Sequence, residues 1–259
     1  MLPSLFLSHG SPMVAVTSDP AHDFLAGLGT RLGRPRAILV ASAHWETASP
    51  VVGAGTRHRT IHDFRGFPPA LYELRYDAPG DPGLAGQVVE LLGAAGLRAG
   101  TDTVRGLDHG AWVPLLLAYP GADVPVVEVS VQPQLGPAHH FQVGRALAPL
   151  RAEGVLVIGS GAFTHDLSRF RGQPEDAPEA ADVAAFSGWM DEALLAGRRD
   201  DLLSYRHKAP YAVAQHPTEE HLLPLFVAMG AAGDSDVPVE RLHSSVSYGV
   251  IRMDAYAFG

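Results

Sequence analysis

Cysteine is absent from all 259 residues of this chain. Its absence excludes disulfide bonds, thiolate ligands to a metal, zinc ribbons and a cysteine nucleophile. Any metal ion must therefore be held by histidine, aspartate, glutamate or backbone oxygen. The 13 histidines make imidazole the donor to examine first.

Basic residues and long apolar runs are also scarce. Lys and Arg number 19 against 28 Asp and Glu, which gives a net charge of −9. This balance argues against a general nucleic-acid binder, because neutralising phosphates requires clustered cations. The apolar residues 1–7 lack a preceding basic region and are too short for a signal peptide or a membrane span. We expect a cytoplasmic protein with neither nucleic acid nor membrane as a partner.

Three common nucleotide-binding or catalytic motifs are missing. Gly159-Ser160-Gly161 follows an apolar run, but Thr164 stands where the dinucleotide fingerprint has its third glycine. No Gly-x-Ser-x-Gly elbow supports a serine hydrolase, and no Gly-Lys-Ser/Thr supports a phosphate-binding P-loop.

Short β-rich apolar runs alternate with helical patterns along the chain. The expected strands are Leu5–Leu7, Ala37–Ala41, Val124–Val131, Val155–Ile158 and Tyr248–Met253. The expected helices are Asp19–Leu32, Gly83–Ala95, Trp112–Ala118, Ala138–Leu150, Ala180–Ala196 and Thr218–Met229. The alternation predicts an α/β fold, a single-domain sandwich over residues 1–259 whose mixed, mostly parallel central sheet has helices on both faces.

Three histidines share one local context. His9, His44 and His165 each follow an expected strand. In open α/β sheets, residues just beyond the carboxyl ends of the strands converge on the ligand crevice. This placement predicts a histidine site at that edge, because three unrelated loop histidines would rarely fall there together.

A fourth candidate lies ahead of the last expected helix, in Gln215-His216-Pro217-Thr218-Glu219-Glu220-His221. His216 and His221 are five residues apart, about 140° around a regular helix, so both cannot face one metal from it. We expect His216, at the helix start, to be the ligand and His221 to pack along the helix.

Two further histidines stand in ring-rich or turn segments. His109, in Leu107-Asp108-His109-Gly110-Ala111-Trp112, precedes a helix and suits a site residue as well as a surface one. His62 lies in a segment rich in Phe, Pro and Tyr, where loop packing is the favoured interpretation. The histidines without a shared context are His22, His58, His139, His140, His207 and His243.

Taken together, the motifs resemble the DOPA 4,5-dioxygenase-like branch of the class III extradiol ring-cleavage dioxygenases (the LigB-type superfamily). They occur in family order from Leu5 to about Gly233. The matching segments are Ser8-His9-Gly10-Ser11-Pro12-Met13, Ser42-Ala43-His44-Trp45-Glu46, Ile61-His62-Asp63-Phe64 with Gly66-Phe67-Pro68, Leu107–Trp112, Gly159-Ser160-Gly161 with Thr164-His165, and His216-Pro217-Thr218 with His221. Asp166 departs from the pattern, which has Asn there.

The resemblance implies one mononuclear divalent metal per chain, Fe(II) for activity or Zn(II) as in relatives. It implies His9, His44 and His216 as ligands, His165 as acid/base and His109 as a substrate contact. An all-histidine set differs from the usual two-histidine, one-carboxylate arrangement. Glu219 or Glu220 therefore stays an alternative to His216, and a fourth-ligand role for His165 stays open.

The implied reaction is insertion of both atoms of dioxygen into a DOPA-like catechol with ring opening. His165 would accept a catechol proton and later return one, a role suited to a near-neutral pKa. The expected pocket wall contains Phe64, Phe67, Trp45 and Tyr72, each equally well read as core. We expect a monomer or small homo-oligomer.

Two other functional classes remain. The same histidines would serve a zinc hydrolase in which zinc-bound hydroxide attacks an ester or amide. A catalytically inactive interaction protein of the same fold is the second alternative, because fold alone does not define function.

Overall fold

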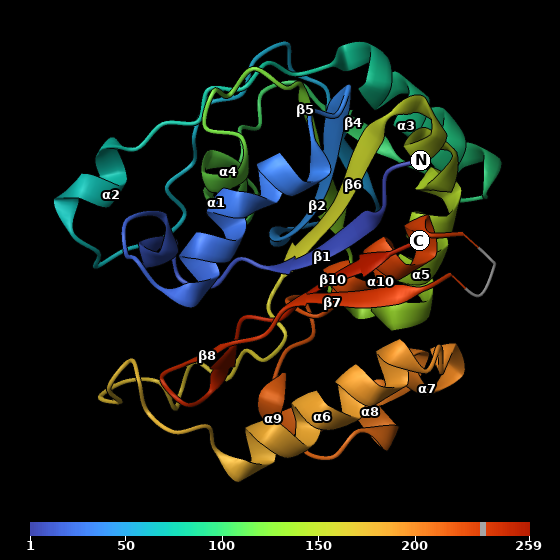
Figure 1. Cartoon of the computed structure of the whole chain (residues 1–259). Coiled ribbons are helices and arrows are strands. Elements are labelled where there is room, and N and C mark those ends of the chain that lie inside the picture. Colours follow the sequence, from blue (N-terminus) through green and yellow to red (C-terminus); the bar gives the residue numbers. More distant parts are fainter. Residues whose placement is uncertain (234–236) are drawn as a thin grey trace.

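An eight-stranded sheet runs through the centre of the molecule (Figure 1). The computed structural model describes residues 1–233 and 237–259. The strands are β1 (Ser4–Ser8), β2 (Ala37–Glu46), β3 (Val51–Gly53), β4 (Gly100–Asp102), β5 (Val126–Val131), β6 (Val155–Gly161), β7 (Val239–His243), β8 (Val246–Ser247), β9 (Ile251–Arg252) and β10 (Ala255–Phe258). The helices are α1 (Pro20–Leu32), α2 (Pro69–Glu73), α3 (Pro82–Ala94), α4 (His109–Ala118), α5 (Gly136–Leu147), α6 (Ala181–Leu195), α7 (Arg199–Leu203), α8 (Tyr205–Lys208), α9 (Ala212–Gln215) and α10 (Leu223–Ala231). The 3-10 helices are η1 (Pro12–Ala15), η2 (Pro133–Leu135) and η3 (Ala148–Glu153).

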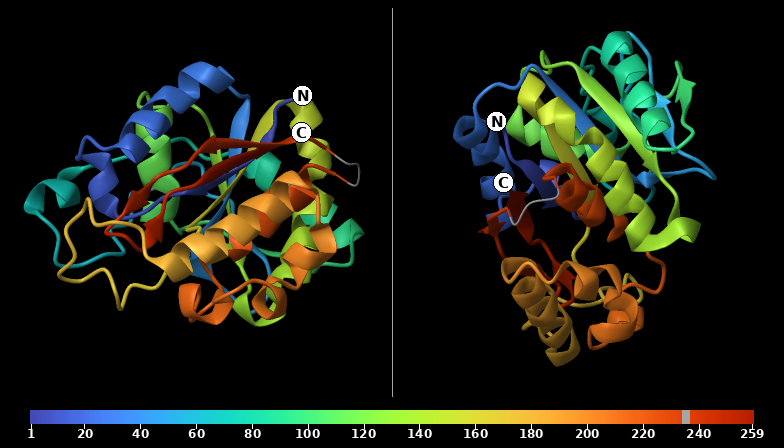
Figure 2. Two further views of the ribbon diagram at one scale, coloured as in Figure 1. Left: turned by 60° about the horizontal axis from the view of Figure 1, so that its bottom comes forward. Right: turned by 90° about the vertical axis from the view of Figure 1, so that its right-hand side faces the viewer.

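The sheet is mixed, with a parallel centre. Its strand order is β4-β3-β5-β2-β6-β1-β10-β7, and β8 and β9 form a separate two-stranded ribbon. The four central strands β5, β2, β6 and β1 are parallel to one another. β10 pairs antiparallel with β1, which brings Ser4 opposite Phe258 and the two termini close together (Figures 1 and 2). The predicted α/β fold class is confirmed.

Alternating side chains of the buried strands build the two faces of the sheet. Leu5 and Leu7 of β1 pack in one core with α1 and α4, whereas Phe6 between them packs in another with α6 and α10. The odd and even positions of β2 separate in the same way, Ile38 toward α1 and α4 and Leu39 toward α3 and α5. This alternation with a period of two covers both faces with helices, as the views of Figure 2 show.

Several short elements were not predicted, and the largest error in a predicted helix boundary is at the start of the last helix. The strands β3 and β4 have three residues each, and β4 carries the sequence Gly-Thr-Asp, so no apolar run marks them. The helix expected from Thr218 begins at Leu223. Residues 217–222 have no helical assignment, and their path depends on contacts with distant segments. Within the described residues, no helix is both long and apolar enough to span a bilayer.

Strand register places the carboxyl ends of β1, β2 and β6 at one edge. Ser8 pairs with Gly161, and Ser42 pairs with Ser160. The residues that directly follow these positions therefore emerge side by side. In β2 the register against β5 shifts between Ala41 and Glu46, an irregularity that re-aims the side chains of this stretch, which contains His44.

Candidate metal centre

Three histidine rings converge at this edge through their Nε2 atoms. His44 Nε2 lies 3.0 Å from His9 Nε2 and 3.3 Å from His221 Nε2. One ring nitrogen from each of the three lies within 4.8 Å of the others. His9 follows β1, His44 lies near the end of β2, and His221 precedes α10. Segments more than 170 residues apart thus supply one cluster.

The spacing of these nitrogens fits a shared metal ion. Imidazole nitrogens bind first-row metals at about 2.0–2.1 Å, so two of them at right angles around one ion are about 3.0 Å apart, and at a tetrahedral angle about 3.4 Å apart. The observed separations of 3.0 and 3.3 Å fall in this range. The donor set is neutral nitrogen, which suits iron and zinc equally, and three facial ligands leave positions free for further groups.

The opposite nitrogens of the three rings face hydrogen-bond acceptors. His9 Nδ1 lies 3.1 Å from Ser160 Oγ, and the Ser160 hydroxyl donates to the Gly110 carbonyl, so its oxygen accepts from the ring. His44 Nδ1 is 3.5 Å from Asp63 Oδ2, and His221 Nδ1 is 2.8 Å from Glu220 Oε1. Protons held on Nδ1 leave the Nε2 lone pairs pointing into the cluster.

Electrostatics keeps the three rings neutral. Burial, reinforced by the neighbouring rings, holds the pKa of His9 and of His221 well below the ordinary histidine value. Burial followed by the adjacent His109 ring lowers the pKa of His44 to about 4. Since a metal binds the neutral imidazole, the cluster needs to release no proton at neutral pH before an ion can enter.

His216, the third expected ligand, lies outside the cluster of His9, His44 and His221. Its Nε2 donates to the Phe163 carbonyl at 3.0 Å, and the ring is fully buried against Phe186 and Tyr205. The argument from helical spacing failed because residues 217–222 are not helical. His221 therefore points to the cluster while His216 packs behind it.

The glutamates weighed as alternative ligands have separate surroundings. Glu219 accepts a hydrogen bond from Tyr205 Oη at 2.9 Å and lies near Arg206. Glu220 faces the site, with Oε1 close to His221 Nδ1 and 4.0 Å from His165 Nδ1. It thus lies beside Nδ1 of both rings, and its oxygen and one nitrogen from each ring lie within 4.8 Å of one another.

Close backbone packing on β6 holds His221 in place. Ala162 N donates to the His221 carbonyl at 2.8 Å, and a Cβ on Gly161 would overlap that carbonyl oxygen. A Cβ on Gly159 would overlap the Pro224 carbonyl in the same way. Gly159 and Gly161 thus leave room for the backbone around His221 and Pro224. Ser160 between them accepts the hydrogen bond from His9 Nδ1.

Replacing Gly161 with alanine should displace His221. We expect Gly161→Ala to lower stability by about 1–3 kcal/mol, the usual cost of overpacking, and to weaken metal binding as well. Gly86→Ala is the matched control, because Gly86 lies inside α3 with nothing within 4 Å of the added Cβ. Thermal unfolding and metal titration of both variants measure the effect. Unchanged metal affinity in a destabilised Gly161→Ala protein would contradict this role.

His165 and His109 adjoin different rings of the cluster. The His165 ring stacks on His221 with centroids 3.4 Å apart and an angle of 14° between planes. The His109 ring centroid is 3.9 Å from that of His44 and 5.3 Å from that of His9. Burial lowers the pKa of His165, although the nearby Glu220 opposes this. The structure thus brings four of the five predicted site histidines to one place.

Asp63 links His109 to the cluster and was not predicted as a site residue. Its Oδ1 accepts from the His109 backbone N–H at 2.9 Å, and its Oδ2 lies 3.0 Å from His109 Nδ1. Burial alone would raise the pKa of Asp63, but the hydrogen bonds from His109 outweigh it and bring the pKa to about 2. The available signal was its place beside His62 and Phe64 in a segment already singled out.

Aromatic rings border the His109 side of the site. Phe64 meets His109 edge-on at 5.7 Å and contacts Phe67 and Tyr72 at 5.3 and 5.2 Å. These three expected wall residues therefore form one cluster beside the histidines. Trp45 differs, because it is buried beneath the Arg105 guanidinium at 4.6 Å.

A buried polar network holds the backbone at Ser42 and His44. Asp108 Oδ1 accepts from Ser42 Oγ at 2.6 Å, and Asp108 Oδ2 accepts from Arg105 Nη2 at 2.8 Å. Arg105 also donates to the His44 carbonyl at 3.3 Å. Burial and the neighbouring Asp108 raise the pKa of Glu128 well above its ordinary value, which favours the protonated carboxyl beside Asp108.

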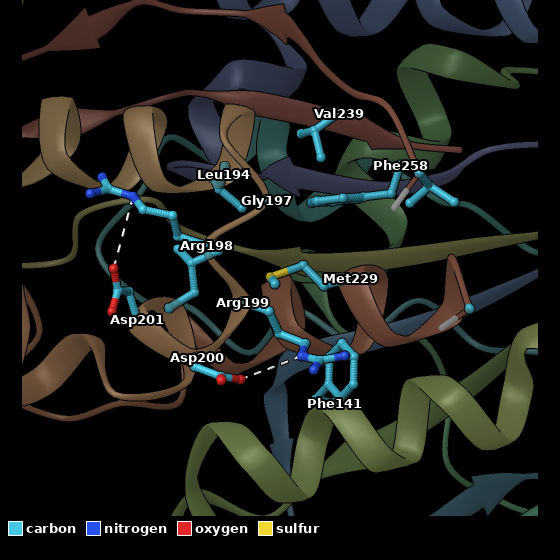
Figure 3. Close-up of a pocket in the computed structure, with 13 residues that line it drawn as sticks. Phe141, Leu194, Gly197, Arg198, Arg199, Asp200, Asp201, Met229, Val239 and Phe258 are labelled. Atoms are coloured by element: carbon cyan, nitrogen blue, oxygen red, sulfur yellow. Dashed lines mark ion pairs between the residues drawn. The ribbon is translucent and has the colours of Figure 1, made fainter. Parts of the chain in front are cut away.

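Two hollows of the surface differ in their relation to the histidines. One of about 380 Å³ is lined by Glu46, Pro133, Pro217, Thr218, Glu219 and Glu220, the last of which contacts His221. Another of about 520 Å³ lies between α5, α10 and the α6–α7 segment (Figure 3). Its charged groups pair with each other, Arg198 with Asp201 and Arg199 with Asp200, and no histidine lines it. The first hollow borders the site through Glu220 alone.

Comparison with known proteins identifies the family to which this chain belongs. The profile of the catalytic LigB subunit of aromatic ring-opening dioxygenase matches residues 3–259. The chain belongs to this family. Its extradiol dioxygenase function agrees with the expectation from the motifs, which is thereby confirmed at the level of reaction class.

Relatives of the LigB-family chain are similar over nearly its full length. A protein of Beta vulgaris named 4,5-DOPA dioxygenase extradiol is 46% identical, covering 98% of this chain and 96% of its own. A protein of the same name from Escherichia coli (strain K12) is 38% identical over 93% of this chain and 90% of its own. The crystal structure of an uncharacterized protein from Escherichia coli K12 superimposes with a TM-score of 0.82, at 33% identity and full coverage of both chains.

Proposed function

We propose that this enzyme opens the ring of a DOPA-like catechol beside its two hydroxyls, using a metal ion held by His9, His44 and His221. The observation that carries the proposal is the convergence of three neutral Nε2 atoms at 3.0 and 3.3 Å, each ring backed by an acceptor. Relatives named 4,5-DOPA dioxygenase extradiol support the substrate class.

The metal in the active enzyme is proposed to be Fe(II), with Zn(II) able to occupy the same ligands. When bound, iron would supply chelation of both catechol oxygens and a path for electron density from the ring to dioxygen. The protein's part is to supply three histidine ligands on one side of the ion and to leave its other coordination positions free for substrate and dioxygen.

His165 is proposed to move the proton in this reaction. Its ring lies against His221, and burial keeps it neutral, so it can accept the proton of a substrate hydroxyl and return it later. Glu220, 4.0 Å from His165 Nδ1, stabilises the ring once it is protonated.

His109 is proposed to contact the substrate from the other side. Its ring lies between His44 and Phe64, so it adjoins both the metal ligands and the aromatic cluster. The Phe64, Phe67 and Tyr72 rings would cover the apolar face of a catechol, whose hydroxyls face the histidines.

Oxygen uptake by the iron-loaded protein tests the proposal. Protein loaded with Fe(II) under anaerobic conditions should consume about one O₂ per catechol with DOPA or caffeate and give a yellow semialdehyde-type product, because ring opening leaves a conjugated chromophore. An oxygen electrode and absorbance spectra measure both.

The alternatives give distinct outcomes in the same assay. Hydrolysis of simple esters by the zinc form, with every catechol left intact by the iron form, would establish a hydrolase instead. Absence of both activities in fully metal-loaded protein would point to an interaction protein.

A further inference from the structure

The carboxylate of Asp63, in the loop before α2, contacts His109 at the start of α4 and faces His44. We propose that Asp63 is a positioning residue, which fixes the ring of His109 in the tautomer with its proton on Nδ1 and thereby makes Nε2 a hydrogen-bond acceptor toward the substrate. This inference deepens the proposed function, on which it rests for the role of His109. It assigns a direction to that contact: the substrate hydroxyl donates and His109 accepts.

Both oxygens of Asp63 bind the same residue. Oδ1 accepts from the backbone N–H of His109 at 2.9 Å, while Oδ2 lies 3.0 Å from Nδ1 of its ring. A two-point contact of this kind fixes the side chain relative to its own backbone, so the ring has little freedom to rotate. His109 is the first residue of α4, and its backbone N–H is one of those that the helix leaves unpaired.

A carboxylate has only acceptors, so each group facing it must donate. Nδ1 of His109 therefore carries a hydrogen, and in the neutral ring Nε2 then carries the lone pair. Among the described residues the ring is hydrogen-bonded only through Nδ1. Nε2, on the opposite edge of the ring, remains available to a ligand.

The same oxygen also faces a metal ligand. Oδ2 of Asp63 lies 3.5 Å from Nδ1 of His44, which is longer than its 3.0 Å separation from His109. The carboxylate thus favours the Nδ1-protonated form in both rings, one pointing Nε2 to the metal position and the other pointing Nε2 to the substrate. Phe64, the next residue, packs edge-on against His109 and holds the loop in register.

Asp63→Asn is the decisive variant. Its amide oxygen can still accept from the backbone N–H, but its NH₂ would donate to Nδ1 and move the His109 proton to Nε2. Two-dimensional ¹⁵N–¹H spectra of the histidine rings, recorded on metal-free and zinc-loaded protein, report the tautomer without any need for activity. We expect an Nδ1-protonated His109 in the unsubstituted protein and an Nε2-protonated one in Asp63→Asn. His109→Gln identifies the signals.

Kinetics of the iron-loaded enzyme separates positioning from a structural role. Asp63→Asn should lose about 10–100-fold in kcat, the usual cost of removing an outer-shell partner. The rate is measured at saturating Fe(II), because the same oxygen also faces the ligand His44 and its loss weakens metal binding. In a His109→Gln background the same change should alter kcat by less than about 2-fold, because Asp63 acts through His109. Asp77→Asn, an exposed carboxyl in the neighbouring segment, is the charge-matched control.

Two results would overturn the inference. An Nε2-protonated His109 in the unsubstituted protein would do so, whether or not Asp63→Asn folds. A loss of about 10–100-fold in kcat on adding Asp63→Asn to the His109→Gln variant would also overturn it, because Asp63 would then act independently of His109. Failure of the iron enzyme to cleave any catechol would instead refute the proposed function, while the ring spectra would still decide the tautomer.

Discussion

His221→Ala protein should bind almost no metal, whereas unsubstituted protein binds about one divalent ion per chain. The physical reason is that the variant loses one of three converging Nε2 donors, 3.3 Å from His44, and leaves two neutral imidazoles to hold the ion. We expect the affinity to fall by more than the ~10–100-fold that follows loss of an outer-shell partner. Ring-opening activity should disappear with the metal. Metal analysis after dialysis, with a competing chelator to rank affinities, measures the change.

His216→Gln is the control that separates the two histidines of this segment. Its ring donates to the Phe163 carbonyl from a fully buried position, so the variant should be less stable but still bind metal. Metal content is counted per folded chain, after size-exclusion chromatography and circular dichroism. Retained metal in His221→Ala together with loss in His216→Gln would restore His216 as the ligand. His44→Ala should behave like His221→Ala.

The second large effect is expected at His165. His165→Ala and His165→Gln should retain metal and bind catechol, yet turn over at least ~10²-fold more slowly, the usual scale for a lost general acid/base. The ring stacks on His221 but is not part of the cluster of His9, His44 and His221, so its removal leaves the three converging nitrogens in place. Single-turnover kinetics with spectroscopic detection of bound catechol separates binding from chemistry. Metal lost in proportion to activity would show a fourth ligand instead of a base.

The pH profile offers an independent check on His165. Burial lowers its pKa from the ordinary value of 6.5, so the base form persists below that pH and the acidic limb of kcat/KM should lie under 6.5. The charge of Asp166 raises this pKa, so Asp166→Asn should move the limb to still lower pH. Metal content should not change, because Asp166 Oδ1 is bound by Ser168 and not by a ligand. If the acidic limb of kcat/KM keeps its position in His165→Gln, the limb reports the titration of a residue other than His165.

Periodicity and position within the chain were sufficient for the framework of the site. The apolar runs around Leu5, Ile38 and Leu156 are short but uninterrupted, and they fold as parallel strands at the centre of the sheet. Because the carboxyl ends of parallel strands meet at one edge, the sequence predicts that His9 and His44 lie together. His165 was placed beside them by the same rule. The local apolar pattern predicts these strands, and therefore the positions of the histidines that follow them, because each strand is buried through its own side chains.

The choice between His216 and His221 depended on tertiary contacts. The spacing argument assumed a helix from Thr218, yet the chain stays irregular until Leu223. What holds it is the bond from Ala162 to the His221 carbonyl and the room left by Gly161. These partners lie about 60 residues earlier in the chain, so no local propensity in residues 216–222 reports them.

The sequence by itself therefore determined the α/β fold, the absence of thiolate chemistry and the histidine-rich edge at which the ligands gather. Only the tertiary structure decided which nitrogen of each ring faces inward, because that depends on Ser160, Asp63 and Glu220 meeting the opposite nitrogens. A strand pattern is a property of neighbouring residues. A tautomer and a ligand set are properties of groups brought together from distant segments, and they exist only once the sheet and its loops have packed.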